Sequence, residues 1–168
     1  ERLVRRALEL DRNDPTVLAH AGWVLNIVLG RIEEGANLLD RAVELDPNHF
    51  LGWTWGGWTS LFLGRKAIEY FERAMRLSPM DPRISASQSG IAAANFVIGR
   101  YEEASSWAAK ALREQPNFPP ALRVSMLSHA LAGRIDDARQ ACAAYLHYDP
   151  AARISSIRNK NGEWMQEW

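Results

Sequence analysis

The sequence lacks the residues on which redox, metal or membrane functions depend. It contains one cysteine, Cys142, which has no partner for an internal disulfide and no nearby metal-ligand residue, so we expect a reducing, cytoplasmic location. Its longest apolar stretch, residues 21–30, is too short to cross a bilayer. The four histidines never occur at i,i+4 spacing: His20, His49, His129 and His147. We therefore expect no metal, no cofactor and no membrane partner.

The charge composition argues against a second group of functions. The 20 Lys and Arg residues balance the 20 Asp and Glu residues, and no basic run is longer than the pair Arg5-Arg6. Nucleic-acid-binding proteins normally carry a basic patch, so we expect no nucleic-acid partner. The serine pairs lack a nucleophile-elbow context, and the glycine-rich run at 52–58 has neither a lysine nor a preceding strand. With no catalytic constellation in the sequence, we expect no enzyme activity from this chain.

What the sequence does contain is an internal repeat. A Gly-Arg dipeptide recurs at intervals of 34, 35 and 34 residues, and each copy precedes a helix-forming segment that ends on a proline. Glycine can close a helix in the left-handed conformation, and acidic pairs such as Glu33-Glu34 favour the first turn of the next helix. Because these acidic pairs recur, we interpret them as helix starts rather than as general acid/base groups. The dipeptides begin at Gly30, Gly64, Gly99 and Gly133.

Asp-Pro steps complete the punctuation, since Asp can cap a helix whose first residue is proline. The pattern predicts first helices near 16–28, 49–62, 83–97 and 118–131. It predicts second helices near 32–45, 66–77, 101–114 and 135–147. Small residues at seven positions should let the paired helices approach closely: Gly35, Ala42, Ala67, Ala74, Ala104, Ala111 and Ala138.

The predicted organisation is four helix pairs and a remnant of a fifth. Residues 1–11 match the end of a repeat, the full repeats cover 12–47, 48–81, 82–116 and 117–150, and residues 151–168 form a capping or docking segment. The chain opens inside a helix and without Met, so we expect a piece of a longer protein. In the second repeat Ala67 follows Gly64 by three residues, two fewer than in the third. Either that turn is shorter or residues are missing after Arg65.

The period and the residue types resemble the tetratricopeptide repeat family over residues 1 to about 150. The resemblance implies an all-α fold, a right-handed α-solenoid of stacked antiparallel helix pairs that binds proteins or peptides. More narrowly, the segments 52–58, 71–82 and 99–123 resemble C-terminal repeat regions of alphaproteobacterial class III adenylate or guanylate cyclase-like proteins. Similar regions follow winged-helix transcriptional regulators. This narrower resemblance implies a regulatory or sensory module whose output domain is not in this chain, and no cyclase residue can be carried over.

First helices line the inner groove of such arrays, and aligning the repeats gives the positions that should face it. One column holds Ala19, Thr54, Ser89 and Arg123, and the next holds Trp23, Trp58, Ala93 and Leu127. With their neighbours, these columns give the groove candidates Trp23, Asn26, Thr54, Trp55, Trp58, Ser89, Phe96, Arg123 and Leu127. Chaperone-binding relatives carry a Lys/Asn/Arg clamp for a terminal carboxylate. Because those positions here read Ala19, Trp23, Trp55, Ala86 and Gly90, we expect no co-chaperone function.

Seven tryptophans favour an apolar ligand such as a peptide or helix. Trp53 and Trp107 match packing positions, whereas for Trp23 and Trp58 a groove role and a packing role both remain open. In the tail, the i,i+4 pair Trp164 and Trp168 either caps the array or docks a partner.

We therefore expect a protein-interaction scaffold, the regulatory portion of a larger bacterial signalling protein. Two alternatives remain. One is a non-catalytic part of a nucleotide cyclase, and the other is a self-association module that forms a homodimer. The sequence upstream of Glu1 would test the first alternative, and light scattering with and without residues 158–168 would test the second.

Overall fold

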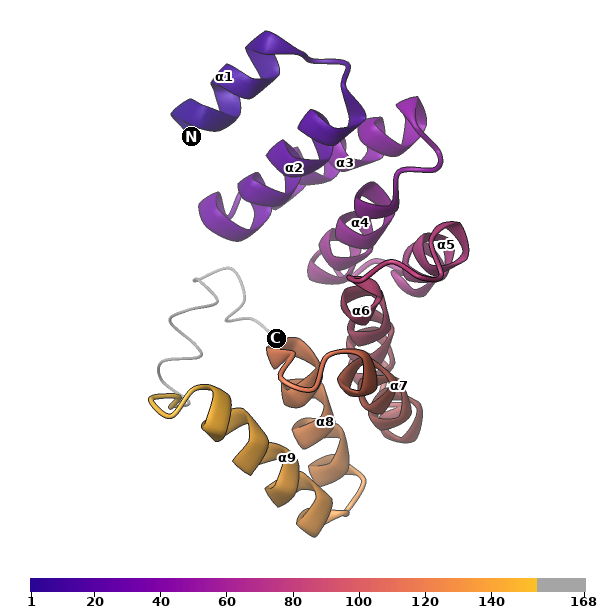
Figure 1. The fold of residues 1–168 in the computed structure, drawn as a ribbon, viewed down its shortest axis with the longest axis vertical. Helices are drawn as coiled ribbons and strands as arrows, with labels where there is room; N and C mark the ends of the chain where they lie inside the picture. Colours follow the sequence, from indigo (N-terminus) through magenta and orange to yellow (C-terminus); the bar gives the residue numbers. More distant parts are fainter. Residues whose placement is uncertain (154–168) are drawn as a thin grey trace. The chain divides into compact units, whose positions relative to one another are not determined.

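The computed structural model describes residues 1–153, and in this part of the chain all the regular structure is helical (Figure 1). The helices are α1 (Arg2–Leu10), α2 (Pro15–Leu29), α3 (Ile32–Leu45), α4 (Phe50–Phe62), α5 (Ile68–Leu77), α6 (Ile84–Val97), α7 (Tyr101–Glu114), α8 (Pro119–Leu131) and α9 (Ile135–Tyr148). Within α1–α5 and within α6–α9, consecutive helices are joined by short turns and pack against each other, so the predicted all-α fold of stacked helix pairs is confirmed.

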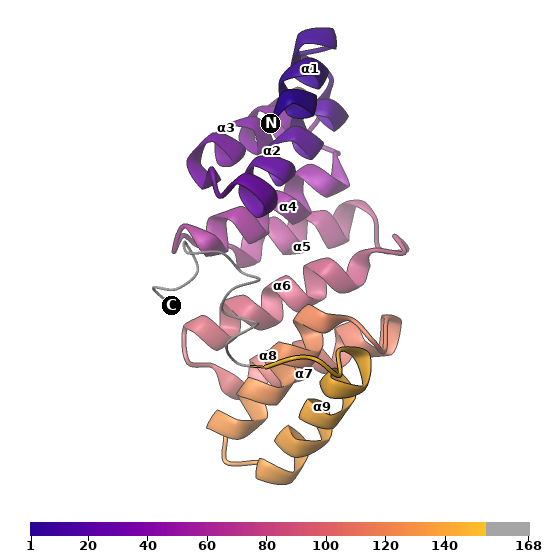
Figure 2. The ribbon, with the colours of Figure 1, turned by 90° about the vertical axis from the view of Figure 1, so that its left-hand side faces the viewer.

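The helices belong to two compact units, Glu1–Pro79 and Met80–Trp168. In the first unit α2 packs against both α3 and α4, α4 packs against α5, and α1 covers one side of α2. In the second unit α6 pairs with α7 and α8 pairs with α9, while α8 also contacts α6 and α7 (Figure 2). The boundary between the units falls within the two-proline junction of the second and third repeats.

Each helix pair turns at the predicted glycine. The four glycines of the Gly-Arg dipeptides all have positive φ angles, between 66° and 79°. In each turn the amide of the following arginine donates to a carbonyl near the end of the first helix, as Arg134 does to His129 at 2.9 Å. These bonds satisfy carbonyls that the helix end leaves without a partner. Glycine is required here because the left-handed conformation is strained for a residue with a Cβ atom.

The Asp-Pro steps serve two different purposes. At the first step, Asp14 caps α2, because its carboxylate accepts from the amides of Thr16 at 2.6 Å and Val17 at 3.0 Å. At the second step, Asp46 accepts from Asn48 in the turn, and α4 starts only after His49, whose ring nitrogen accepts from Gly52. The prediction that Asp caps the next helix therefore holds for α2 and is wrong for α4. It is also wrong for α6, because Asp81 accepts from the amide of Arg83 and the helix begins only at Ile84.

The second repeat differs from the others in its second helix. α5 has 10 residues, whereas α3, α7 and α9 each have 14. Ala67 lies just before α5 and is 3% exposed, so it keeps the packing position that Ala104 occupies in the next repeat. The two residues that the segment from Gly64 to Ala67 lacks are therefore lost from the start of the helix, and the turn after Gly64 is not shortened.

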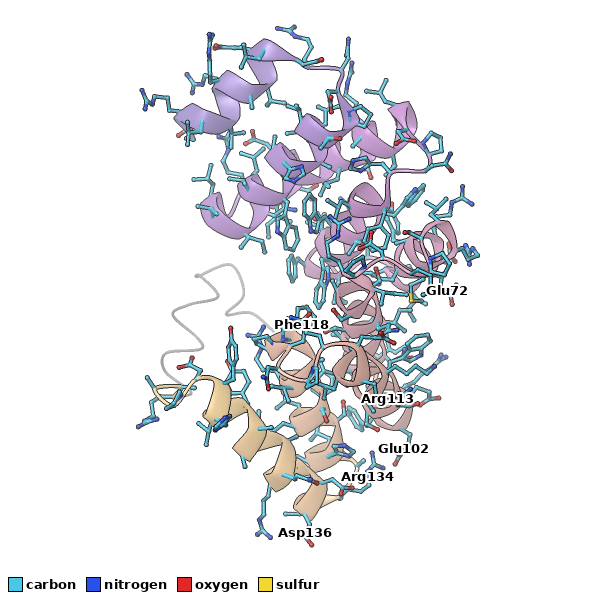
Figure 3. All side chains as sticks on the ribbon, in the orientation of Figure 1. Glu72, Glu102, Arg113, Phe118, Arg134 and Asp136 are labelled. Carbon is cyan, nitrogen blue, oxygen red and sulfur yellow. The ribbon has the colours of Figure 1, made fainter. Side chains whose placement is uncertain are left out.

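Arginines of the Gly-Arg dipeptides join neighbouring repeats. Arg65 forms an ion pair with Glu33 at 3.1 Å, and Arg134 forms one with Glu102 (Figure 3). In each pair the acid begins the second helix of one repeat and the arginine closes the first helix of the next. Arg31 reaches Glu1 at 3.4 Å in the same way. The acidic residues at the starts of the second helices therefore also pair with the arginine of the next repeat, which the sequence of one repeat alone does not indicate.

Candidate functional site

The first helices of the N-terminal unit carry no charge. Neither α2 nor α4 contains an Asp, Glu, Lys or Arg residue, whereas the second helix α3 contains four acidic residues and one arginine. Charged side chains normally cover an exposed helix face, so their absence from both first helices leaves apolar and aromatic groups to meet whatever lies beside them.

Three aromatic rings from these helices form one cluster. The indoles of Trp23 on α2 and Trp55 on α4 are stacked, with centroids 5.7 Å apart and planes 7° from parallel. His20 lies edge-on to Trp55, with centroids 4.9 Å apart, and its Nδ1 donates to the carbonyl oxygen of Thr16 at 2.8 Å. The ring orientation of His20 is therefore fixed by its own helix, one turn before Trp23.

The cluster extends along α2 as an apolar face. His20, Trp23, Val24 and Ile27 follow i, i+3, i+4, i+7 spacing and so share one side of the helix. His20 and Ile27 are exposed, while Trp23 and Val24 are half-buried. We refer to these four residues together with Trp55 as the aromatic patch. Its rings combine apolar area with edges that can accept or donate weak polar contacts, and such surfaces dominate protein interfaces.

The rings of the patch rest on the core. Trp55 packs against the buried cluster formed by Leu18, Ala19, Leu39 and Ala42. Trp23 is held by the face of Trp55. Because both rings are supported from below and half-exposed above, the patch loses little side-chain freedom when a ligand covers it.

Two of the predicted groove residues are buried in the core of the first unit. Asn26 and Thr54 each have 0% exposure, so neither contributes surface to a groove in this structure. Asn26 Nδ2 donates to Thr59 Oγ1, and that hydroxyl donates to the carbonyl oxygen of Trp55 at 2.8 Å. Asn26 therefore ties α2 to α4 directly beneath the aromatic patch, which is a positioning role.

The side chain of Asn26 occupies the space that the missing Cβ atom of Gly35 leaves free. A Cβ atom on Gly35 of α3 would lie 2.6 Å from the carbonyl oxygen of Gly22, and one on Gly22 would lie 2.7 Å from that of Gly35. The backbones of α2 and α3 thus touch at these two glycines. This contact explains why a helix-weakening glycine stands at Gly35, where the other repeats carry alanine.

The remaining tryptophans of the first unit lie between helices. Trp58 packs edge-on against the fully buried Phe71, at 5.7 Å, and also against Phe62 at 6.1 Å. Trp53 packs against Tyr70 at 5.5 Å and donates its indole N–H to the carbonyl oxygen of Pro47 at 2.9 Å. Of the two tryptophans left open by the sequence, Trp23 joins the patch and Trp58 joins the α4–α5 contact.

The second unit holds the other four predicted residues. Ser89 has 0% exposure, and Phe96 packs on the cluster of Ala92, Ala104, Ala108 and Val124. Arg123 is half-buried and Leu127 is exposed, both on α8. Trp107 also packs on that cluster, with Lys110 Nζ lying 3.6 Å from its ring centre. No aromatic stack comparable with that of Trp23 and Trp55 is found among these residues.

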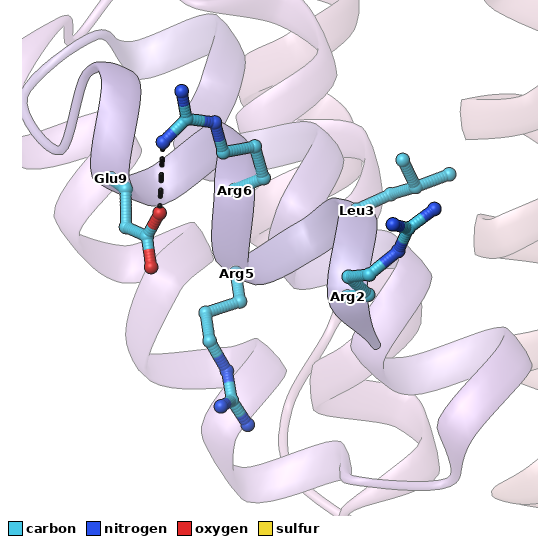
Figure 4. A pocket seen from close by; sticks show the side chains of 5 residues that line it. All are labelled: Arg2, Leu3, Arg5, Arg6 and Glu9. Atoms are coloured by element: carbon cyan, nitrogen blue, oxygen red, sulfur yellow. Dashed lines mark hydrogen bonds and ion pairs between the residues drawn. The ribbon is translucent and has the colours of Figure 1, made fainter.

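A separate apolar groove lies between α1 and α2. Its walls are Leu3, Val4 and Ala7 on one side and Val17, Ala21 and Val24 on the other, with a volume of about 390 Å³. Val24 and His20 line this groove and also belong to the aromatic patch. The outer face of α1 next to it carries Leu3 and three arginines, with Arg6 bonded to Glu9 at 3.2 Å (Figure 4).

Three of the patch residues were missed by sequence reasoning: His20, Val24 and Ile27. The available signal was their spacing from Trp23 on a helix without charge. Over residues 1–153 no three His, Cys, Asp or Glu side chains are grouped so as to hold a metal ion. None of the described helices is both long and apolar enough to cross a membrane. Trp164 and Trp168 lie outside the described residues.

The same fold occurs in solved tetratricopeptide repeat proteins. TTC0263, a thermophilic protein of Thermus thermophilus, has a TM-score of 0.76 at 18% identity, covering 98% of this chain and 88% of that one. YrrB, described as having an unusual peptide-binding site, has a TM-score of 0.64 at 18% identity, covering 98% and 87%. PilW, a type IV pilus biogenesis factor, has a TM-score of 0.72 at 19% identity, covering 92% and 71%. No family model and no curated protein sequence matches the chain, and the structural likeness concerns the fold.

Proposed function

We propose that this chain is a non-catalytic binding scaffold whose aromatic patch holds the apolar face of a partner peptide or helix. The observation that carries the proposal is the supported, half-exposed stack of Trp23 on Trp55 between two helices that have no charged residue. An uncharged surface offers no ion-pair partner for an acidic or basic peptide. A ligand with apolar side chains at helical spacing would bury the rings without leaving a charge unpaired.

The positions that carry a carboxylate clamp in chaperone-binding relatives also favour an apolar ligand in this chain. Two of them are Trp23 and Trp55, so the surface meets a ligand with rings where those relatives would use cationic or amide groups. The solved protein YrrB has a peptide-binding site on the same fold. That site supports peptide binding as a use of this architecture.

The test is a binding titration with a defined probe. A fluorescein-labelled amphipathic helix with Leu and Phe on one face is titrated with the full chain, and a scrambled peptide of identical composition serves as the control. We expect saturable binding of the helix alone. Trp23→Ala should weaken it by about tenfold or more, because aromatic anchors dominate interface energies. Trp107→Ala, a matched loss of a half-buried indole in the other unit, should leave the affinity unchanged. Equal binding of both peptides would reject the proposal.

We further propose that the scaffold is the regulatory portion of a larger bacterial signalling protein in the cytoplasm. The support is the resemblance of segments 52–58, 71–82 and 99–123 to repeat regions of cyclase-like proteins. The alternative is that the chain is a non-catalytic part of a nucleotide cyclase, whose activity belongs to another domain of the parent protein. Sequencing the gene upstream of the Glu1 codon tests both, since a cyclase or winged-helix domain there supports the proposal and an unrelated domain rejects it.

A further inference from the structure

A groove on the second unit lies between α7 and α9, with α8 at its base. It has a volume of about 500 Å³, and its apolar lining consists of Leu112, Pro116, Leu122, Ala141 and Ala144. At the position of Ala141 the three earlier repeats carry larger side chains: Leu38, Tyr70 and Trp107. At the position of Ala144 they carry long cations: Arg41, Arg73 and Lys110. The wall that α9 gives to this groove is therefore small and uncharged, unlike that of any earlier repeat.

The next repeat in an array does not cover a groove of this kind. In the first unit α4 packs on α2 and α3, and the counterpart groove between α1 and α3 remains open, with a volume of about 490 Å³. Four charged residues line that counterpart: Arg5, Glu9, Arg12 and Arg41. The groove between α7 and α9 is lined by one acid, Asp137, and by no lysine or arginine. It therefore suits an apolar occupant, which the counterpart does not.

In the second repeat the equivalent space holds an aromatic ring. Trp53 of α4 packs edge-on against Tyr70 of α5 and donates its indole N–H to the carbonyl oxygen of Pro47 at 2.9 Å. Counted back from the glycine of the Gly-Arg turn, Trp53 corresponds to Leu122 and Pro47 corresponds to Pro116. Both counterparts line the α7–α9 groove, and no described tryptophan or tyrosine lines it. The fourth repeat thus keeps the place of the ring and lacks the ring itself.

The carbonyl oxygen that receives the indole in the second repeat has a counterpart in Pro116. The residue before each proline has the same backbone conformation, with φ −133° and ψ 93° at Asp46 and φ −140° and ψ 93° at Gln115. Its amide donates to a carbonyl one turn back, at 3.0 Å for Asp46 and 2.9 Å for Gln115. No described residue donates to the carbonyl oxygen of Pro116. An indole N–H in the groove would therefore find an acceptor without a protein partner.

One end of the groove can receive a cation. The side chain of Asp137 is 54% exposed, and its carboxylate lies 3.7 Å from Arg134 Nε and 3.9 Å from His129 Nδ1. Both distances exceed a hydrogen bond, because Arg134 bonds instead to Glu102 and to His129. Asp137 precedes Ala141 by one turn of α9, about 6 Å along the helix axis. A cation at that distance from a ring beside Ala141 would reach the carboxylate.

We propose that this groove binds a tryptophan side chain of a partner peptide in extended conformation, with a lysine or arginine two residues away. The indole would cover Leu122 beside Ala141 and donate its N–H to the carbonyl oxygen of Pro116. Two residues of extended chain span about 6.6 Å, so the cation would meet Asp137. At the aromatic patch the chain supplies the rings, whereas here it receives one. This second docking site therefore goes beyond the proposed function.

The first experiment titrates the full chain into a fluorescein-labelled peptide, Gly-Ser-Trp-Ser-Lys-Gly-Ser, and follows fluorescence anisotropy. We expect saturable binding. A peptide with leucine in place of the tryptophan should bind about tenfold more weakly or worse, because it offers less apolar area and no N–H donor. A peptide with glutamate in place of the lysine should lose several-fold in affinity, because its carboxylate would lie beside Asp137.

The second experiment fills the groove from within. Ala141→Tyr installs the residue of the second repeat, Ala144→Arg installs that of the first two, and each should weaken binding of the tryptophan peptide about tenfold or more. Ala109→Tyr, at an exposed position of α7 outside the groove, should bind as the parent does. Asp137→Asn should remove the preference for lysine over glutamate, and Asp136→Asn should keep it. If Ala141→Tyr changes the far-ultraviolet circular dichroism, Ala144→Arg at its exposed position decides alone.

Three outcomes would overturn the proposal. They are equal affinity for the tryptophan and leucine peptides, full affinity of both groove-filling variants, and binding that appears only after Trp164→Ala/Trp168→Ala, which would make the chain's own tail the occupant. Trp23→Ala separates this site from the proposed function. That variant should lose the amphipathic helix and keep the tryptophan peptide, and Ala141→Tyr should do the reverse, so either proposal can fail while the other stands.

Discussion

The indole of Trp55 lies flat on the indole of Trp23, although the two residues are 32 positions apart and belong to different repeats. The stack exists only because α2 and α4 pack side by side with the right register, which Asn26 fixes by its bond to Thr59. The aromatic patch is therefore a property of two adjacent repeats, and disrupting either repeat removes it.

The stack should be measurable as a coupling between its members. Trp55→Ala should lower the free energy of unfolding by about 2 kcal/mol, since the ring also packs on the core, and Trp23→Ala by about 1 kcal/mol. The double variant should show a coupling of about 0.5–1.5 kcal/mol in urea unfolding, the range of aromatic pairs. Additive losses would mean that the rings do not interact.

Gly35→Ala should destabilise the chain even though alanine favours helices. The new Cβ would meet Asn26 and the backbone of Gly22, and overpacking of this kind costs about 1–3 kcal/mol against a propensity gain of about 1 kcal/mol. Gly56→Ala is the comparison, because its Cβ would meet only the ring of the half-buried Tyr70, at 3.1 Å. Thermal unfolding should rank Gly35→Ala well below Gly56→Ala, and the reverse order would contradict the close α2–α3 approach.

Arg134→Ala should cost more stability than loss of an ordinary surface arginine. Arg134 bonds to Glu102, to Ser105 Oγ at 2.9 Å and to His129 Nδ1 at 3.0 Å, and so links α7, α8 and the turn before α9. We expect a loss of about 1 kcal/mol, since the side chain is 30% exposed and its ion pair is screened by solvent. Arg139→Ala removes only an exposed pair with Asp136 and should change the unfolding midpoint negligibly.

Asp14 should make part of the stability depend on pH. The amides of Val17 and Thr16 donate to its carboxylate and hold the pKa of Asp14 below its usual value. A group whose folded pKa is depressed stabilises the fold above its unfolded pKa, and that stabilisation is lost as the pH falls through the folded pKa. Acid unfolding of Asp14→Asn, which keeps a capping acceptor without a titrating charge, should show a weaker pH dependence below about pH 4. An unchanged acid profile would contradict this role.

Local chemistry allowed most of the fold to be predicted. Glycines that take positive φ angles and acidic first turns each act within a few residues, so the helices lie within two residues of their predicted limits. The exceptions to the rules are also local. Asp46 serves a turn instead of capping α4, and α5 loses its first turn because Ala67 keeps its packing place.

The site was less predictable because it depends on which face each helix turns inward. The column of Ala19, Thr54 and Ser89 was assigned to the groove, yet all three side chains have 0% exposure. Their small size was the available signal, since small residues mark places where helices approach closely. The stack of Trp23 on Trp55 and the pairing of Arg134 with Glu102 could not be inferred from one repeat, because each contact needs the register between two repeats.

The ion pairs between the arginines of the Gly-Arg turns and the acidic residues that begin the second helices also bear on how the number of repeats can change during evolution. Each pair needs only an acid at the start of one second helix and an arginine at the next Gly-Arg turn, and both belong to the same recurring segment. A stretch of DNA that encodes one period, cut at Gly64-Arg65 or Gly133-Arg134 and duplicated, would therefore carry both an acid and an arginine for its new neighbours. The turn at Gly99-Arg100 follows α5, which lacks an acidic residue at the position of Glu33 and Glu102, so a junction there would need a compensating mutation.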